Sequence, residues 1–461
     1  MSYLTDLMTE HRGENFFLHE QYLNAQMVKV LKTIGYDRLY TRAAGPYLYD
    51  DKGDEYLDLL AGWGVFALGR NHPKVKAALQ DVLSQDLPDM VQLDVSLLAG
   101  LLAERLLRFT PGDICKLFFC SSGAEAVEAA IKFSRYTTKR PRILYLEHGF
   151  HGLTMGALSL NGDKLFQEGF DPLLPDCYPV PFNDLAALEK ALHHRDVAAF
   201  VFEPIQGKGV NIPRDDYLPE AARLCRKYGT LLVADEIQTG LGRTGKFFAV
   251  EHWGVEPDMI CMAKALSGGF VPVGAVAMRK PIMDAVFNRM DRAVVHGSTF
   301  SKNNMAMAAG LATLQVLEEE KLVEHAATLG TQLIRDLQAL VGKYEFLKEV
   351  RGRGMMIALE FGSPKSLSLK AAWGFLETAN KGLFCQMIAI PLFKTHRILS
   401  QTAGHGMNVL KLLPPLVIGE RDRQWTVSAL DKVIADCHKV PGSVWELGKT
   451  LAGHALRARA G

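Results

Sequence analysis

Several classes of protein are excluded by what this chain lacks. Its 52 Lys and Arg residues balance 51 Asp and Glu residues, so no excess charge draws it to nucleic acid or an acidic membrane. No apolar run reaches the roughly 18 residues of a membrane span, and the first ten residues lack the features of a secretory signal. The seven cysteines form no CxxC pair, which favours reduced thiols in a cytoplasmic protein.

Short apolar segments alternate with helical patterns through much of the chain. Such segments, bounded by turn residues, are typical of strands buried on both faces. The alternation predicts an α/β fold with a mostly parallel sheet and helices on both faces. The expected strands are 116–120, 142–146, 198–202, 231–234, 259–262 and 273–278, and the expected helices are 124–136, 184–192 and 218–228.

The remaining segments predict a smaller α+β domain formed by both ends of the chain. The expected divisions are an N-terminal segment 1–70, a large domain 71–330, a C-terminal small domain 331–442 and a helix or tail 443–461. Further expected elements are helices at 15–32, 304–340 and 425–438, and strands at 355–360 and 384–388.

Lys264 and Asp235 carry the clearest chemical signal. Lys264 follows an apolar strand, and Asp235 lies 29 residues earlier, at the end of another. This pair suits pyridoxal phosphate (PLP), because the amine can form a Schiff base with the cofactor aldehyde. The carboxylate can keep the pyridine nitrogen protonated, so that the ring accepts electrons from a substrate carbanion. Glu203 also comes directly after an expected strand. Ligands bind beyond the carboxyl ends of the strands in such sheets, so Glu203 is expected near the same site.

Ser122, Gly123 and Ala124 lie between a strand and a helix. Ser122 suits the N-cap, and the two small residues leave the first helical N–H groups open. A helix N-terminus attracts anions, so this turn is a candidate phosphate site. The alternative is a plain capped helix.

Two further patterns are weaker. Gly240–Gly245 fits GxGxxG and Gly240–Lys246 fits GxxxxGK, but Phe247 replaces the P-loop Ser or Thr and no long helix is expected afterwards. The histidines show no HxxxH or HExxH spacing, so no metal site is predicted. We expect a glycine-rich loop at an active site.

A set of ordered blocks points to one family. They are GRNHP (69–73), SSGAEA (121–126), GFHG (149–152), EPIQG (203–207), ADEIQTGLGRTG (234–245), KALSGG (264–269), HGSTF (296–300) and PPL (414–416). Over about residues 40–425 the chain therefore resembles the class III (ornithine-type, ω-) aminotransferases of PLP fold type I.

The resemblance implies roles for the residues around the cofactor ring. Lys264 would be the Schiff-base lysine and proton shuttle, and Asp235 the partner of the ring nitrogen. Gln238 would lie near the phenolic oxygen, and Phe150 would stack on the ring with His151 beside it. Taken alone, Phe150 could equally belong to the core and Gln238 to a surface turn.

The resemblance also implies a phosphate site and a dimer. The backbone of Gly123 and Ala124 would bind phosphate, helped by Ser122, and Glu203 would line the site. Thr299 would reach the phosphate from the neighbouring subunit, which implies a homodimer. A helix cap is the alternative for Thr299.

Four positions depart from the family pattern on the substrate side. Lys411 stands where users of α-amino acids carry a carboxylate-binding arginine, and Lys208 follows the block in which a gating glutamate is expected. Leu153 replaces an arginine and Trp63 a tyrosine. We infer an apolar substrate side that suits a hydrophobic amine, an ω-amino compound or a fatty aldehyde. The alternative is that another arginine, Arg397, acts as the clamp.

The sequence therefore predicts a PLP-dependent aminotransferase acting between an amine or amino acid and an aldehyde or 2-oxo acid. An aminomutase, decarboxylase or epimerase on the same fold is the alternative. A non-catalytic binding protein is less favoured, because Lys264, Asp235 and Gln238 are all present.

Overall fold

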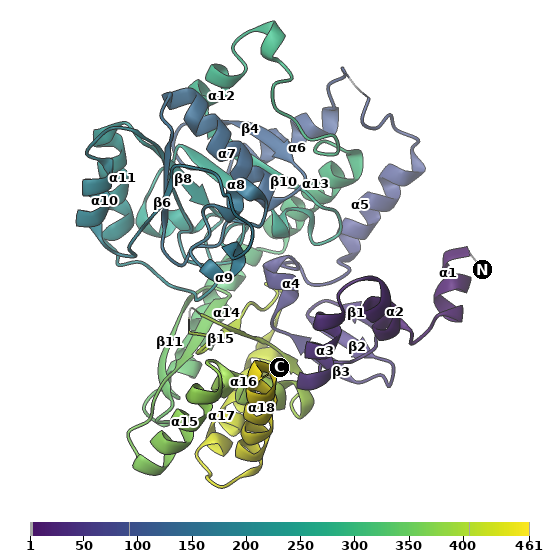
Figure 1. Cartoon of the computed structure of the whole chain (residues 1–461). Helices are drawn as coiled ribbons and strands as arrows, with labels where there is room; N and C mark the ends of the chain where they lie inside the picture. Colours follow the sequence, from purple (N-terminus) through teal and green to yellow (C-terminus); the bar gives the residue numbers. More distant parts are fainter. Residues whose placement is uncertain (1–2, 92, 405, 461) are drawn as a thin grey trace.

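The computed structural model describes residues 3–91, 93–404 and 406–460. Residues 1, 2 and 461, which fall in the expected divisions 1–70 and 443–461, lie outside the described residues. Three sheets organise the chain, and the largest occupies the upper part of Figure 1.

The largest sheet has seven strands in the order β4-β10-β9-β8-β7-β5-β6. Their bounds are β4 (Ile114–Cys120), β5 (Arg142–Leu146), β6 (Cys177–Val180), β7 (Val197–Phe202), β8 (Leu231–Asp235), β9 (Met259–Met262) and β10 (Gly274–Arg279). Strands β5 to β9 pair in parallel, whereas β10 is antiparallel to both of its neighbours. The predicted mostly parallel sheet is confirmed. Strand β6 was missed because it contains Pro179 and is largely exposed, both unlike a buried strand.

Successive residues of these strands pack against opposite helical layers, as the period of two requires. Val233 of β8 contacts the cluster that includes α7 (Gly123–Thr138) and α12 (Lys280–Val286). Its neighbours Leu232 and Ala234 belong to the other cluster. The helices of that second layer are α6 (Leu97–Leu107), α10 (Leu185–Leu192), α11 (Tyr217–Tyr228) and α13 (Asn304–Glu319). Helices thus cover both faces, as predicted (Figure 1).

Two smaller sheets lie below the large one in Figure 1. The first has the order β1-β2-β3-β13 and the second β11-β12-β15-β14. Strand β13 pairs in parallel with β3, so a C-terminal segment joins the N-terminal sheet. The bounds are β1 (Tyr40–Ala44), β2 (Tyr47–Asp50), β3 (Glu55–Asp58), β11 (Leu347–Arg353), β12 (Met356–Phe361), β13 (Ile398–Leu399), β14 (Gln401–Ala403) and β15 (Val409–Leu412).

The strand predicted at 384–388 is wrong. This segment lies within helix α16 (Leu383–Lys394), most of whose residues are buried. A short apolar run does not distinguish a buried strand from a buried helix, and here the helix is apolar on all sides. The helices packed around it are α15 (Leu367–Ala379), α17 (Glu420–Cys437) and α18 (Ser443–Ala460).

Two helices predicted as continuous are each divided. The helix expected at 15–32 is α2 (Asn15–Tyr22) and α3 (Ala25–Ile34), because Asn24 caps α3 by accepting a hydrogen bond from the Met27 N–H at 3.1 Å. The stretch expected at 304–340 is α13 and α14 (Leu322–Gln338). Lys321 separates them with a left-handed φ of 51°, which a helix does not accommodate.

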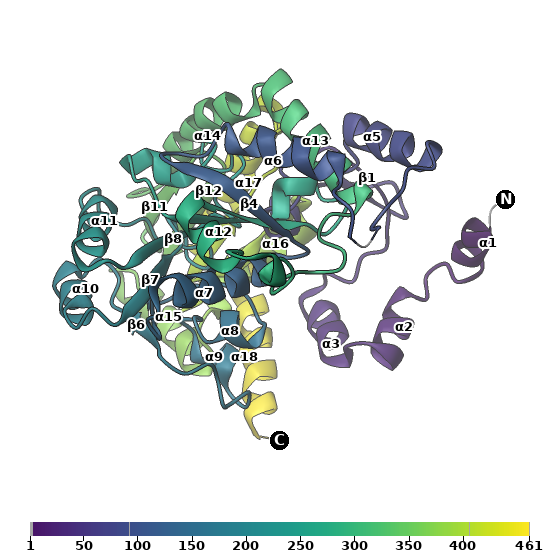
Figure 2. The same ribbon diagram turned by 90° about the horizontal axis from the view of Figure 1, so that it is seen from above.

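The N-terminal helices stand apart from the body. Figure 2 shows α1 (Tyr3–Glu10) and α2 extending away from the sheets. Tyr3, Met8, Phe17 and Tyr22 are exposed on them. Across the described part of the chain, we find no helix with the length and hydropathy needed to cross a membrane.

Candidate active site

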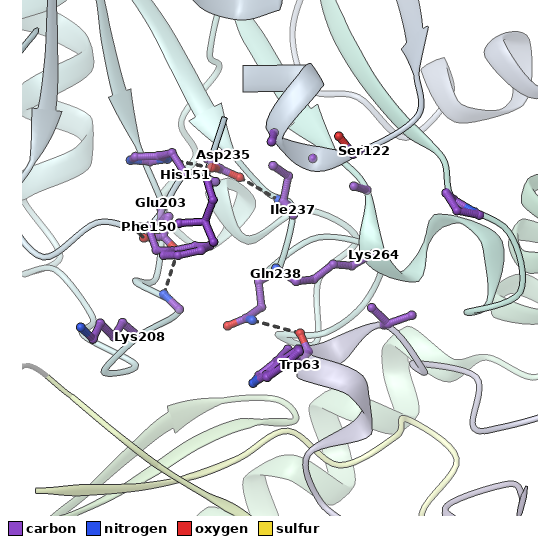
Figure 3. A pocket seen from close by; sticks show the side chains of 18 of the residues that line it. Trp63, Ser122, Phe150, His151, Glu203, Lys208, Asp235, Ile237, Gln238 and Lys264 are labelled. Carbon is purple, nitrogen blue, oxygen red and sulfur yellow. Dashed lines mark hydrogen bonds and ion pairs between the residues drawn. The ribbon is translucent and has the colours of Figure 1, made fainter. Parts of the chain in front are cut away.

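A cavity of about 850 Å³ opens at the carboxyl ends of β7, β8 and β9. Its walls come from the large sheet and its loops, from Trp63 in the N-terminal part, and from Gln401 and Lys411 of the C-terminal sheet. Parallel sheets bind ligands at this edge. Figure 3 shows the side chains of Lys264, Asp235 and Gln238 directed toward the same space.

Lys264 begins a short 3-10 helix (Lys264–Ser267) directly after β9. Its φ of 40° lies in the left-handed region, where a residue with a side chain is strained by about 1–3 kcal/mol. Burial lowers the pKa of the Lys264 amine, although the charges of Asp235 and Glu203 oppose this. A lowered pKa favours the uncharged amine, which is the form that acts as nucleophile or base.

Asp235 ends β8 and is held on both carboxylate oxygens. Its Oδ2 lies 2.7 Å from Nδ1 of the fully buried His151, and its Oδ1 accepts the Ile237 N–H at 3.1 Å (Figure 3). Burial disfavours a charged His151, but the hydrogen bond to Asp235 and the charges of Asp235 and Glu203 outweigh it and raise the pKa of the imidazole. His151 therefore holds the Asp235 carboxylate in a fixed orientation.

Glu203 anchors the loop that carries Phe150. Its carboxylate accepts the backbone N–H groups of Phe150 at 2.9 Å and Gly207 at 2.8 Å. Burial, together with the neighbouring Asp235, raises the pKa of Glu203, although His151 opposes this. Phe150 is held at the cavity wall, edge-on to Phe166 with 5.6 Å between ring centroids.

The N-terminus of α7 forms another wall. Ser122 Oγ accepts the Glu125 N–H at 3.2 Å, which confirms the predicted N-cap, and Gly123 and Ala124 line the cavity. A Cβ on Gly123 would lie 2.9 Å from Ile237 Cδ1, so a side chain there would displace the wall. The first turn of this helix therefore presents unobstructed N–H groups that suit an anion.

These residues fit PLP. A buried lysine supplies the amine, an ionised carboxylate held by His151 suits the ring nitrogen, and a helix N-terminus suits the phosphate. The Nε2 atom of His151 is buried without a hydrogen-bond partner among the described residues. Buried polar atoms are normally paired, so this atom is consistent with a site that receives a further polar group.

The four substrate-side residues all line the same cavity. Trp63 and Leu153 are each 59 % exposed, so they lie at its open side. Lys208 forms an ion pair with Asp163, and burial lowers the pKa of its amine. The substrate side is therefore apolar at its entrance, and the amine of Lys208 is already paired.

Lys411, on β15, is only 3 % exposed. Its Nζ donates to the Gly207 carbonyl and to Gln238 Oε1, the latter at 2.8 Å. Burial lowers the pKa of Lys411 to about 7, and the positive charges of Lys264 and Arg243 add to the effect. Gln238 in turn donates from Nε2 to the Trp63 carbonyl at 3.0 Å (Figure 3).

Two residues named in the sequence analysis lie elsewhere. Arg397 pairs with Asp54 at 2.8 Å and does not line the cavity, and no arginine occurs among the described residues that do. The alternative clamp is therefore absent from this cavity. Thr299 is exposed and outside the cavity of its own chain, while the adjacent Ser298 contacts Ser121 through their hydroxyls at 3.0 Å.

The residues that the sequence analysis missed include Ile237 and Phe166 of the cavity wall and Asp163, the partner of Lys208. Ile237 could have been identified, because it follows Asp235 by two residues in the same family block and lines the same cavity. Phe166 belongs to the four-residue helix α9 (Lys164–Gln167), and Asp163 is its N-cap. This segment carries none of the family blocks, so nothing in the sequence placed either residue near the site.

The glycine-rich segment does not resemble a nucleotide site. Arg243 is 1 % exposed and donates to the carbonyls of Met355 and Pro414, so the loop is packed against the C-terminal half. Only a 3-10 helix (Ala249–Trp253) follows. In the described residues, no group of three or more His, Cys, Asp or Glu side chains is arranged to hold a metal.

The family model described as aminotransferase class-III matches residues 32–434. The chain belongs to the class-III aminotransferases. This confirms the resemblance seen in the ordered blocks, and members of the family depend on PLP.

Relatives of this class-III aminotransferase include PigE of Serratia sp. and a putrescine aminotransferase of Pectobacterium atrosepticum. The aminotransferase PigE is 35% identical over 92% of this chain, which spans about half (53%) of that relative's length. The putrescine aminotransferase is 41% identical over 74% of this chain and 75% of its own.

Solved structures agree with the fold. The ornithine aminotransferase of Toxoplasma gondii superposes with a TM-score of 0.82 at 30% identity, covering 95% of this chain and 100% of its own. A PLP-bound amine transaminase from an uncultivated Pseudomonas species gives 0.76 at 32% identity, covering 87% and 95%. The predicted PLP fold type I is confirmed.

Proposed function

We propose that this chain is a PLP-dependent aminotransferase that moves an amino group between an amino donor and an aldehyde or 2-oxo acid. The observation that carries the proposal is the pair formed by Lys264 and Asp235 in one cavity, with the N-terminus of α7 on its wall. When bound, PLP supplies an electron sink next to the substrate carbon.

The residues of the chain divide the remaining work. Lys264, buried and with a lowered pKa, can accept at Nζ the proton that leaves the substrate carbon and later give it up again. Asp235 would face the ring nitrogen and favour its protonated form, while His151 and the Ile237 N–H hold the carboxylate in place. The N–H groups of Gly123 and Ala124, with the Ser122 hydroxyl, would hold the phosphate.

The substrate side favours a hydrophobic amine or aldehyde. Trp63, Leu153, Phe150 and Phe166 form the apolar part of the cavity. The cavity-lining residues that the structure describes include no arginine fork for a carboxylate. The names of two relatives fit a donor without a carboxylate, since one is an amine transaminase and the other a putrescine aminotransferase.

We further propose a cytoplasmic homodimer in which Thr299 completes the phosphate site of the partner subunit. Thr299 is exposed, and so are its neighbours Val294 and Phe300, at 81% and 60%.

The seven cysteines, all among the described residues, are unpaired, as in a reducing compartment. We retain the division into a large domain 71–330, a small domain built from 1–70 and 331–442, and a C-terminal segment 443–461, whose helix α18 (Ser443–Ala460) packs on α15, α16 and α17.

The test is the visible absorbance of the purified protein after incubation with PLP. We expect a cofactor band that is lost when L-glutamate, L-alanine or a long-chain amine is added, with release of the corresponding carbonyl product. An added aldehyde or 2-oxo acid should restore the band and become aminated. A band that changes without a released carbonyl compound would favour an aminomutase, decarboxylase or epimerase, and no band would refute the assignment of Lys264.

A further inference from the structure

Lys411 and Gln238 form a hydrogen-bonded cluster with two backbone carbonyls. Lys411 Nζ contacts the Gly207 carbonyl and Gln238 Oε1, and Gln238 Nε2 donates to the Trp63 carbonyl. The cluster joins β15 of the C-terminal sheet to the loops after β7 and β8. It thus lies between the two halves of the cavity.

The contacts of Lys411 are those of an internal residue. A lysine amine has donors but, when charged, no acceptor, and both of its partners here are acceptors. The side chain is 3% exposed, whereas Trp63 on the same cavity is 59% exposed. Internal acceptors thus take two of the three N–H donors of a charged Lys411, so a substrate carboxylate would have to compete with them or use the one donor that remains.

The same contacts determine which way the Gln238 amide faces. An amide carries an acceptor oxygen and an NH₂ group with two donors. With Oε1 toward Lys411 Nζ, the NH₂ group donates to the Trp63 carbonyl and has a second N–H to offer. The reverse orientation would place the amide oxygen against the Trp63 carbonyl, two acceptors in contact, so the hydrogen-bond network selects one orientation.

Packing at Gly207 reinforces this orientation. A Cβ built on Gly207 would lie 2.7 Å from Gln238 Oε1 and 3.0 Å from Glu203 Oε1. Any side chain there would push the amide away from Lys411. Gly207 therefore allows the close approach on which the cluster depends.

We propose that Lys411 is a positioning residue that orients the Gln238 amide so that its free N–H faces the ligand held at Lys264. Lys411 is then not the group that binds a substrate carboxylate. The consequence is a preference for donors that carry no carboxylate next to the reacting amine. This inference rests on the proposed aminotransferase function and identifies its donor class as amines.

The experiment compares Lys411→Met, Gln238→Ala and the double variant with the wild-type holoenzyme. Three quantities are measured: the midpoint of the pH titration of the cofactor absorbance, the dissociation constant of PLP, and kcat/KM for a long-chain primary amine and for L-alanine. Lys208→Met is the matched control, because this lysine lines the same cavity without contacting Gln238.

We expect both single variants to move the absorbance midpoint in the same direction and to weaken PLP binding by about 10-fold. The double variant should change neither quantity further, because the two residues act through one amide. The wild type should prefer the amine to L-alanine, and Lys411→Met should lower kcat/KM for both donors alike. Lys208→Met should leave the absorbance midpoint where it is.

A different outcome would identify a carboxylate clamp. In that case Lys411→Met would raise KM for L-alanine alone and leave the absorbance titration unchanged, which overturns the proposal. If Lys411→Met does not fold, Gly207→Ala displaces the same amide while retaining Lys411, and an unchanged midpoint there also overturns it. A wild-type protein that binds no PLP would instead refute the proposed function itself.

Discussion

The two halves of the cavity are built on different principles. On the cofactor half, Lys264, Asp235, His151 and Glu203 come from the edge of one sheet, and each charge has a neighbour of opposite sign. On the substrate half, Lys208 and Lys411 come from different segments, and the amines of both have internal partners. The cofactor half therefore holds paired charges that suit a ligand bound in one position. The substrate half is an apolar opening in which no unpaired charge selects for a carboxylate.

The largest effect should come from removing the amine of the cofactor half. We expect Lys264→Ala to lower kcat by at least about 10³-fold, because both the covalent link and the proton transfer depend on Nζ. Single-turnover kinetics and the visible absorbance of the variant with PLP measure this. Lys227→Ala, an exposed lysine paired with Glu189, is the control and should behave as the wild type. Retained turnover in Lys264→Ala would mean that another group carries the proton.

Asp235→Asn should produce the next largest effect. The change keeps the shape of the side chain but removes the charge, so we expect kcat/KM to fall by about 10²-fold. The pKa of His151 should also fall, because its hydrogen bond to the Asp235 carboxylate and the nearby charge are what raise it. Histidine NMR titration of the apoenzyme checks this second effect independently of activity. An unchanged His151 titration would show that Asp235 does not govern the imidazole.

The two halves also differ in how far the sequence predicts them. Asp235, Gln238 and Lys264 lie in contiguous blocks at the ends of buried strands, so a local pattern places them at one edge. Phe166 lies in the short helix α9 and Asp163 at its N-cap, and their positions depend on how that helix packs rather than on local spacing. The partners of Lys411 are 173 and 204 residues away in sequence, which no local pattern encodes.

The same limit explains the errors in the fold. The strands 142–146 and 259–262 were predicted correctly because they are central and apolar. The segment 384–388 is equally apolar but lies in a helix surrounded by other helices, so its burial is tertiary in origin. Its hydrophobicity therefore predicted burial without predicting the type of element.

A smaller effect should follow from placing a charge on the apolar half. We expect Leu153→Arg to lower kcat/KM for a long-chain amine by about 10-fold and to raise it for a donor that carries a carboxylate. Met155→Arg is the matched control, because Met155 is also exposed nearby but does not line the cavity. Equal losses for both donors in Leu153→Arg would show that the entrance does not discriminate by charge.

The smallest effect concerns stability. Burial, with the charges of Lys264 and Arg243, lowers the pKa of Lys411 to about 7 in the folded protein, against about 10.4 for an unfolded lysine. Between these values the unfolded chain binds more protons at this site, so the contribution of Lys411 to the free energy of unfolding rises with pH, by up to about 1.4 kcal/mol per pH unit. Below about pH 7 both states are protonated and the contribution is constant.

Lys411→Met removes this pH dependence while adding a constant loss of two hydrogen bonds. Urea unfolding of both apoenzymes should therefore show a stability difference that is constant below about pH 7 and shifts in favour of the wild type toward about pH 9. Profiles that stay parallel over the whole range would mean that the folded protein keeps Lys411 charged. The substrate half would then hold a buried charge, as the cofactor half does, and the contrast between the two halves would be weaker.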